Sequence, residues 1–80
     1  MRVGTVAKRQ TKEHAANRAG EARDKARTHR DAAFAWEQVA RGYDKTAPDE
    51  AALYRALSNY QTDAAEVCTK HAAVFAEMAK

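Results

Sequence analysis

Apolar and small residues recur at alternating intervals of four and three positions along most of this chain, in two separate series. This spacing keeps each series on one stripe of an α-helix, facing one partner helix. The first series is Ala15, Ala19, Ala22, Ala26, His29, Ala33, Trp36, Ala40 and Tyr43. The second series is Leu53, Leu57, Tyr60, Ala64, Val67, His71, Val74 and Met78. Together they predict an all-α, antiparallel two-helix hairpin with coiled-coil-like packing.

The segment between the two series carries the signals of a turn. Gly42 is suited to a left-handed cap at the end of the first helix. Thr46 is suited to cap the second helix, with Pro48 in its first turn. Asp49 would complement the positive end of the helix dipole. The turn therefore joins two long helices that run in opposite directions.

These signals set the expected boundaries. We expect a single domain over residues 1–80, with a first helix at about 11–41 and a second at about 47–79. Residues 1–7 lack helical periodicity, and we expect them to be flexible. If the two series face each other, Trp36 lies opposite Tyr60.

The composition predicts a weak core. The chain holds 20 alanines, two leucines and no isoleucine. Because burial stabilises by roughly 25 cal/mol per Å² of apolar surface, alanine contributes little. A chain of this length buries only about 60% of its unfolded surface. We therefore expect the hairpin to gain stability by association, most simply as a homodimer that forms a four-helix bundle.

A further stripe on the second helix supplies the expected dimer contact. It consists of Tyr54, Ser58, Gln61, Ala65, Cys68, Ala72, Phe75 and Ala79. One partner helix cannot cover both stripes of the second helix. We therefore predict an oligomer interface made by Tyr54, Ala65, Cys68, Ala72 and Phe75. The alternative is a set of scattered exposed apolar side chains, which protein surfaces commonly carry.

The charges are unevenly distributed along the chain. Residues 1–30 carry nine basic and three acidic side chains, whereas residues 31–80 carry five and eight. A basic helix can neutralise phosphates and release their counterions. The candidate nucleic-acid contacts are Arg18, Arg23, Lys25, Arg27 and Arg30. These residues surround the first helix without interleaved aromatics, so a solvated helix face is the competing interpretation.

Catalytic and metal-binding patterns are weak. His29 and His71 are expected in adjacent layers of the hairpin, but zinc sites usually need three or four protein ligands. Cys68 and His71 form an i,i+3 pair without an evident pocket. The sequence has no glycine-rich phosphate loop. We therefore expect no enzyme activity, no cofactor and no metal, and the ligand role of the two histidines stays open.

The sequence also bears on location and on the class of function. Cys68 is the single cysteine, which suits a reducing compartment. No stretch approaches the roughly 20 apolar residues that cross a bilayer, and the N-terminus does not resemble a signal peptide. We expect a cytoplasmic protein without a membrane partner. Its expected function is that of a small helical scaffold or protein–protein interaction module, and the alternative is a nucleic-acid-associated accessory or regulatory protein.

Overall fold

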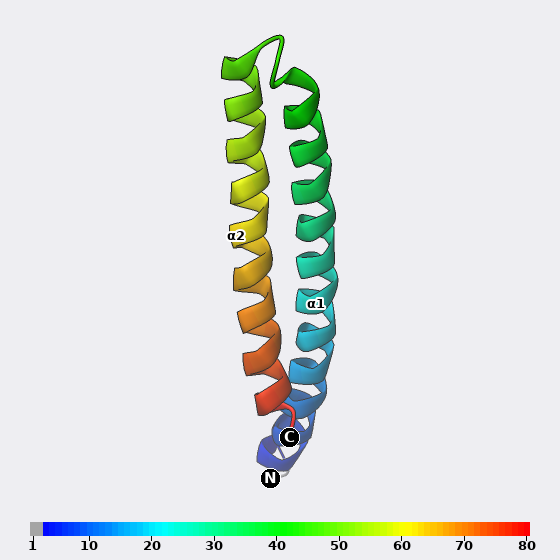
Figure 1. The fold of residues 1–80 in the computed structure, drawn as a ribbon. Helices are drawn as coiled ribbons and strands as arrows, with labels where there is room; N and C mark the ends of the chain where they lie inside the picture. The colour runs from blue at the N-terminus through cyan, green and yellow to red at the C-terminus, as the bar shows by residue number, and fades with distance from the viewer. Residues whose placement is uncertain (1–2) are drawn as a thin grey trace.

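Two long helices make up the fold of this protein, as shown by a computed structural model (Figure 1). The structure describes residues 3–80, with side chains from residue 11 onward. Helix α1 spans Val3–Tyr43 and helix α2 spans Pro48–Met78. The helices run antiparallel, so both chain ends lie at the same end of the molecule, which measures 68 × 15 × 13 Å. The predicted all-α antiparallel hairpin is confirmed.

Helix α1 is longer at both ends than the expected range of 11–41. It begins at Val3, so it includes residues 3–7, while residues 1 and 2 lie outside the described residues; the expected flexibility of this segment stays a prediction. At its other end α1 continues through Gly42 to Tyr43. The φ angle of Gly42 is not positive, so the predicted left-handed cap does not form. The chain reverses immediately afterwards, where the Ala47 N–H donates to the Tyr43 carbonyl at 2.8 Å.

Helix α2 begins one residue later than expected. Ala47 is its N-cap residue and makes no side-chain cap hydrogen bond, so the predicted cap by Thr46 is wrong. Pro48 stands in the first turn, where its missing N–H costs no helical hydrogen bond. Asp49 and Glu50 follow it, near the positive end of the helix dipole. Proline and these carboxylates therefore define the start of α2.

The core between the helices consists of small side chains. Among the described side chains, no large one is fully buried. Helix α1 contributes six buried alanines from its predicted series, and α2 contributes three alanines with Ser58. Within these sets a small residue recurs every seventh position: Ala19, Ala26, Ala33 and Ala40 on α1, and Ala51, Ser58, Ala65 and Ala72 on α2. Small residues on both sides let two helix axes approach closely.

The assignment of the two stripes on α2 in the sequence analysis is wrong. The stripe from Tyr54 to Ala79, which was expected between subunits, faces α1 and contains every buried residue of α2 except Ala51. The series from Leu53 to Met78, which was expected to face α1, is exposed instead, apart from the half-buried Ala64. Close contact between alanines leaves no room for leucine, tyrosine and methionine at the centre, so these larger side chains lie outside.

The register of the hairpin differs accordingly. The buried Ser58 hydroxyl donates to the Ala33 carbonyl at 2.7 Å, and Trp36 stacks on Tyr54 with ring centroids 5.6 Å apart. The expected pairing of Trp36 with Tyr60 is therefore wrong. With Ala33 beside Ser58, the antiparallel register brings Ala40 level with Ala51.

Candidate interaction surface

The most prominent surface feature is a row of exposed apolar side chains along α2. We define the outer α2 stripe as the series Leu53, Leu57, Tyr60, Ala64, Val67, His71, Val74 and Met78. All of its large apolar members are exposed, including Tyr60 at 68% and Leu53 at 67%. Scattered apolar residues are ordinary on a surface, whereas large contiguous apolar patches are typical of binding and assembly sites.

The hairpin itself explains why this stripe stays uncovered. At 3.6 residues per turn, the outer α2 stripe lies about a quarter turn around α2 from the buried stripe. Over the described residues 3–80, α1 is the one other helix, and it already packs on the buried stripe. A third helix is needed to cover the remaining side.

Aromatic side chains support the end of the stripe nearest the turn. The ring of Tyr54 is stacked between two α1 residues, with centroids 5.6 Å from Trp36 and 5.5 Å from Tyr43. Tyr54 also borders a shallow groove with Leu53, Leu57 and Tyr60. Of these three rings, Tyr54 links the groove to the aromatic contacts between α1 and α2.

The residues predicted for the oligomer interface lie elsewhere. Ala65 and Ala72 are buried against α1, while Tyr54, Cys68 and Phe75 are half-buried at the edges of the same contact. The Arg18 guanidinium lies over the Phe75 ring, 5.4 Å from its centroid. Ala65 and Ala72 therefore belong to the contact between α1 and α2 within the hairpin, while an interface role of Tyr54, Cys68 and Phe75 stays a prediction.

The predicted nucleic-acid contacts divide between two sides of the hairpin. Arg23, Arg27 and Arg30 line one groove between the helices, where Arg30 Nη2 donates to Thr69 Oγ1 at 2.8 Å. Asp31 is the one acidic side chain among the residues that line this groove, and four alanines also line it. The structure thus brings three of the five residues together on one side.

Arg18 and Lys25 line a second groove with Glu21, His71 and Cys68. Arg18 Nε lies 3.7 Å from a Glu21 carboxylate oxygen. This groove borders the outer α2 stripe, since Val67 contributes to its wall. The basic charge on this side is partly neutralised and lies beside apolar surface.

The histidines are not brought together. His29 Nδ1 lies 2.6 Å from Gln61 Oε1, within hydrogen-bond distance. His71 is exposed and lies ten residues beyond Gln61 on α2, about 15 Å along the helix axis. Among the described residues, no three side chains of the metal-binding types gather at one place. The predicted adjacency of the two histidines is wrong.

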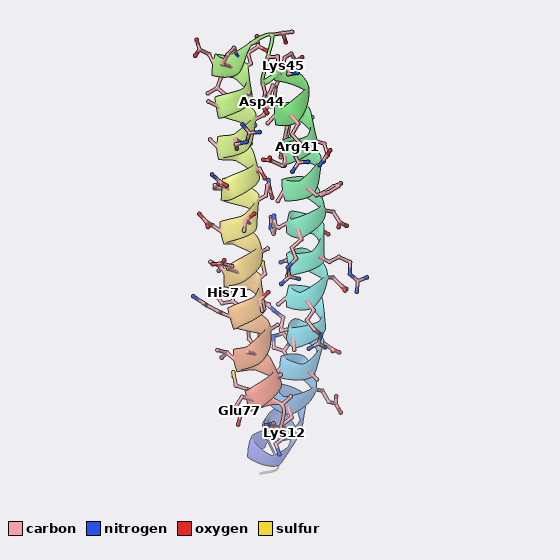
Figure 2. The ribbon with its side chains drawn as sticks, viewed as in Figure 1. Lys12, Arg41, Asp44, Lys45, His71 and Glu77 are labelled. Carbon is pink, nitrogen blue, oxygen red and sulfur yellow. The ribbon has the colours of Figure 1, made fainter. Side chains whose placement is uncertain are left out.

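A charge cluster near the turn was missed in the sequence analysis. Arg55 on α2 donates to both carboxylate oxygens of Asp44, at 2.9 and 3.1 Å, and also approaches Glu37 on α1 at 3.3 Å. These hydrogen bonds from Arg55 hold the pKa of the Asp44 carboxyl below its ordinary value, and they raise the pKa of Arg55. Figure 2 shows Asp44 and Lys45 at this end of the hairpin, with Lys12 and Glu77 at the other.

Comparison of the chain with models of known protein families, with curated proteins and with solved structures finds no match. Neither helix, over the residues that the structure describes, is long and apolar enough to cross a membrane. The fold and the surface define the class: a two-helix hairpin with one uncovered apolar stripe.

Proposed function

We propose that this protein is a non-enzymatic interaction module that pairs its α2 helix with a helix of a partner. The observation that carries the proposal is the outer α2 stripe, whose large apolar side chains are exposed along the length of the helix. Its spacing of four and three is the spacing with which one helix packs against another. An amphipathic helix laid along this stripe would bury its apolar side chains in turn.

The simplest such partner is a second hairpin, giving a homodimer that forms a four-helix bundle. Two helices enclose little apolar volume, and the core of this hairpin is built from alanines. Adding helices on the outer α2 stripe would supply the larger buried side chains that the hairpin lacks. In this arrangement the subunit contact uses Leu57 and Val67 in place of Ala65 and Ala72.

A substitution in the middle of the stripe tests the proposal. Val67→Asp places a charge where a partner helix would exclude water, which is costly. The tagged parent and the tagged Val67→Asp variant are each used to pull down proteins from nuclease-treated extract of the native cell. We expect the variant to lose the protein partners that the parent retains, including untagged copies of the chain. Circular dichroism should show that the variant keeps its helices.

Phe34→Asp is the matched control. Phe34 is as exposed as Tyr60 but lies on α1, away from the outer α2 stripe. This variant should retain the same partners as the parent. Retention of all partners by Val67→Asp would contradict the proposal.

The second candidate function is association with nucleic acid through the groove that Arg23, Arg27 and Arg30 line. Three guanidinium groups on one side of the hairpin could bind successive phosphates of a nucleic-acid backbone, and binding of this kind weakens steeply with salt. Replacing all three with glutamine should weaken binding and flatten its salt dependence. A matched Arg18→Gln, Lys25→Gln variant, altered on the other side, should bind like the parent. Equal effects of both variants would contradict a specific role for this groove.

A further inference from the structure

We propose that the partner of the outer α2 stripe is the same stripe of a second copy of this chain, packed antiparallel about a twofold axis that passes between Ala65 and Glu66. This proposal rests on the proposed function, commits to the second copy as the partner, and adds the orientation and register of the contact. Each α2 helix would contact its own α1 on one side and the α2 helix of the second copy on another. The two α1 helices would lie on the outside of the four-helix assembly.

The spacing of the stripe is symmetric about that axis. Its intervals run four, three, four, three, four, three, four, and therefore read the same in both directions. An antiparallel copy centred between residues 65 and 66 brings every member of the stripe opposite another member. The four kinds of layer are Ala64 with Val67, Tyr60 with His71, Leu57 with Val74, and Leu53 with Met78.

The sizes of the paired residues also match. At the axis, Ala64 pairs with Val67, and these two small residues let the α2 helices approach closely. Towards the ends, Val74 and Met78 of the second copy meet the groove that Leu53, Leu57 and Tyr60 border. The one polar pair, Tyr60 with His71, sets a hydroxyl against an imidazole, two groups that can share a hydrogen bond.

Charges beside the stripe favour the antiparallel direction. Asp63 and Lys70 each stand one position before a stripe residue, on the side of α2 turned away from α1. In the antiparallel arrangement, Asp63 of each copy lies beside Lys70 of the other, giving two opposite-charge pairs across the interface. Within the described residues, neither side chain forms an ion pair in its own chain.

A parallel arrangement would lose these pairs. In a parallel coiled coil, a residue that directly precedes a stripe residue lies beside a residue about five positions further along the partner helix. That partner residue directly follows the next stripe residue. On α2 those following positions include Cys68 and Phe75, which already pack against α1. Asp63 and Lys70 would then face occupied, uncharged positions.

The exposed area is large enough for this interface. The surface of the chain is 6191 Å², whereas a folded monomer of this mass exposes about 4,800 Å². The excess is greater than the roughly 800 Å² that each partner contributes to a standard stable interface. A hairpin that exposes this much surface for its mass has room for a partner of standard size on its exposed side.

Disulfide trapping tests the orientation. In a Cys68→Ala background, Leu57→Cys and Val74→Cys single variants, one of them enlarged by a tag, are mixed and oxidised. The antiparallel arrangement predicts a mixed disulfide dimer between the two variants. It predicts no dimer of Leu57→Cys with itself, because the two copies of position 57 lie about 25 Å apart along the axis, far beyond disulfide reach. A Leu57→Cys homodimer as the main product would overturn the antiparallel orientation and leave the proposed function standing.

Charge exchange tests the register with unmodified cysteine. Asp63→Lys should raise the Kd of the dimer roughly tenfold, and adding Lys70→Asp in the same chain should restore it, because both opposite-charge pairs re-form. No restoration in the double variant would overturn the register. A parent that is monomeric by light scattering at all concentrations up to millimolar would overturn the choice of a second copy. In that case, loss of partner binding by Val67→Asp would still support the interaction module, whereas retained binding would contradict it.

Discussion

A single arginine ties together three parts of the hairpin. Arg55 extends from α2 to Asp44 in the turn and to Glu37 on α1. Its two contacts with Asp44 have the forked geometry that suits a guanidinium and a carboxylate. Because both oxygens of Asp44 accept hydrogen bonds in the folded state, its pKa falls below the usual value of 3.8. The contact holds the turn against both helices.

This lowered pKa predicts a pH dependence with a definite sign. The unfolded carboxyl binds a proton more readily than the folded one, so the stabilisation is present above pH 3.8 and is lost as the pH falls through the folded pKa. Between about pH 5 and pH 2, we expect the melting temperature of the parent to fall further than that of Arg55→Gln. Arg41→Gln should show a smaller change than Arg55→Gln, because the charge of Arg41 also lowers the pKa of Asp44 but makes no hydrogen bond to its carboxylate. Parallel curves for the parent and Arg55→Gln would contradict this role of Arg55.

The buried hydroxyl of Ser58 makes the central polar contact between the helices. It donates to the Ala33 carbonyl and is one of the few polar groups in an alanine core. Ser58→Ala should lower the free energy of unfolding by about 1 kcal/mol in denaturant titrations. Thr62→Ala is the control, because Thr62 bonds only to the Ser58 carbonyl within α2. An equal loss in both variants would show that the bond to α1 adds nothing.

Between the elements, the distance of closest approach is set by alanine. Ala40 has no exposed surface, and the register places it level with Ala51, which is 2% exposed. Ala40→Leu would force the helices apart and should cost about 1–3 kcal/mol. Ala35→Leu, on the exposed side of the same helix, should leave the free energy of unfolding nearly unchanged. Stability of Ala40→Leu equal to that of Ala35→Leu would contradict the close packing, and thermal melts of the two variants would decide.

The sequence predicted the hairpin and the contact stripe of α1, because α1 has one stripe of small residues and a polar remainder. On α2 two stripes share the same spacing, and the larger apolar residues of one suggested the core. The overlooked signal was the seven-residue repeat of small residues in both helices, such as Ala26, Ala33, Ser58 and Ala65. Matching small with small on both helices would have selected the observed register.

The candidate surfaces were predictable only in part. The basic residues were correctly located on α1, yet their division between two grooves depends on which α2 residues lie beside them. Arg23 and Lys25 are two positions apart and therefore point to different sides of the helix. Arg55 was missed because its contacts join residues far apart in sequence, and their meeting depends on the turn. The residues of the outer α2 stripe were identified correctly from their spacing, but the sequence analysis placed them against α1.

At the scale of the whole molecule, the hairpin is 68 Å long but only 15 Å and 13 Å across. Such a shape exposes a large area and buries little at its centre. In the isolated chain the helices are joined by alanine contacts, by Ser58, by the stack of Trp36, Tyr54 and Tyr43, and by the charges near the turn. A partner on the outer α2 stripe would add the burial of leucine, valine and methionine side chains to this core.

If a second copy supplies that burial, stability must depend on protein concentration. Only the folded chain presents the outer α2 stripe as a continuous surface, so mass action stabilises the folded dimer as concentration rises. We expect the melting temperature of the parent to increase steadily over a hundredfold range of concentration. When that range lies above the Kd, association adds about 2.7 kcal/mol to the stability of the folded chain across it. Val67→Asp should melt at a lower temperature that does not change with concentration, because its hairpin core is intact and only the association is lost. Phe34→Asp should follow the parent. A parent melting temperature that is independent of concentration would show that no second copy covers the stripe, and the alanine core would then hold the hairpin by itself.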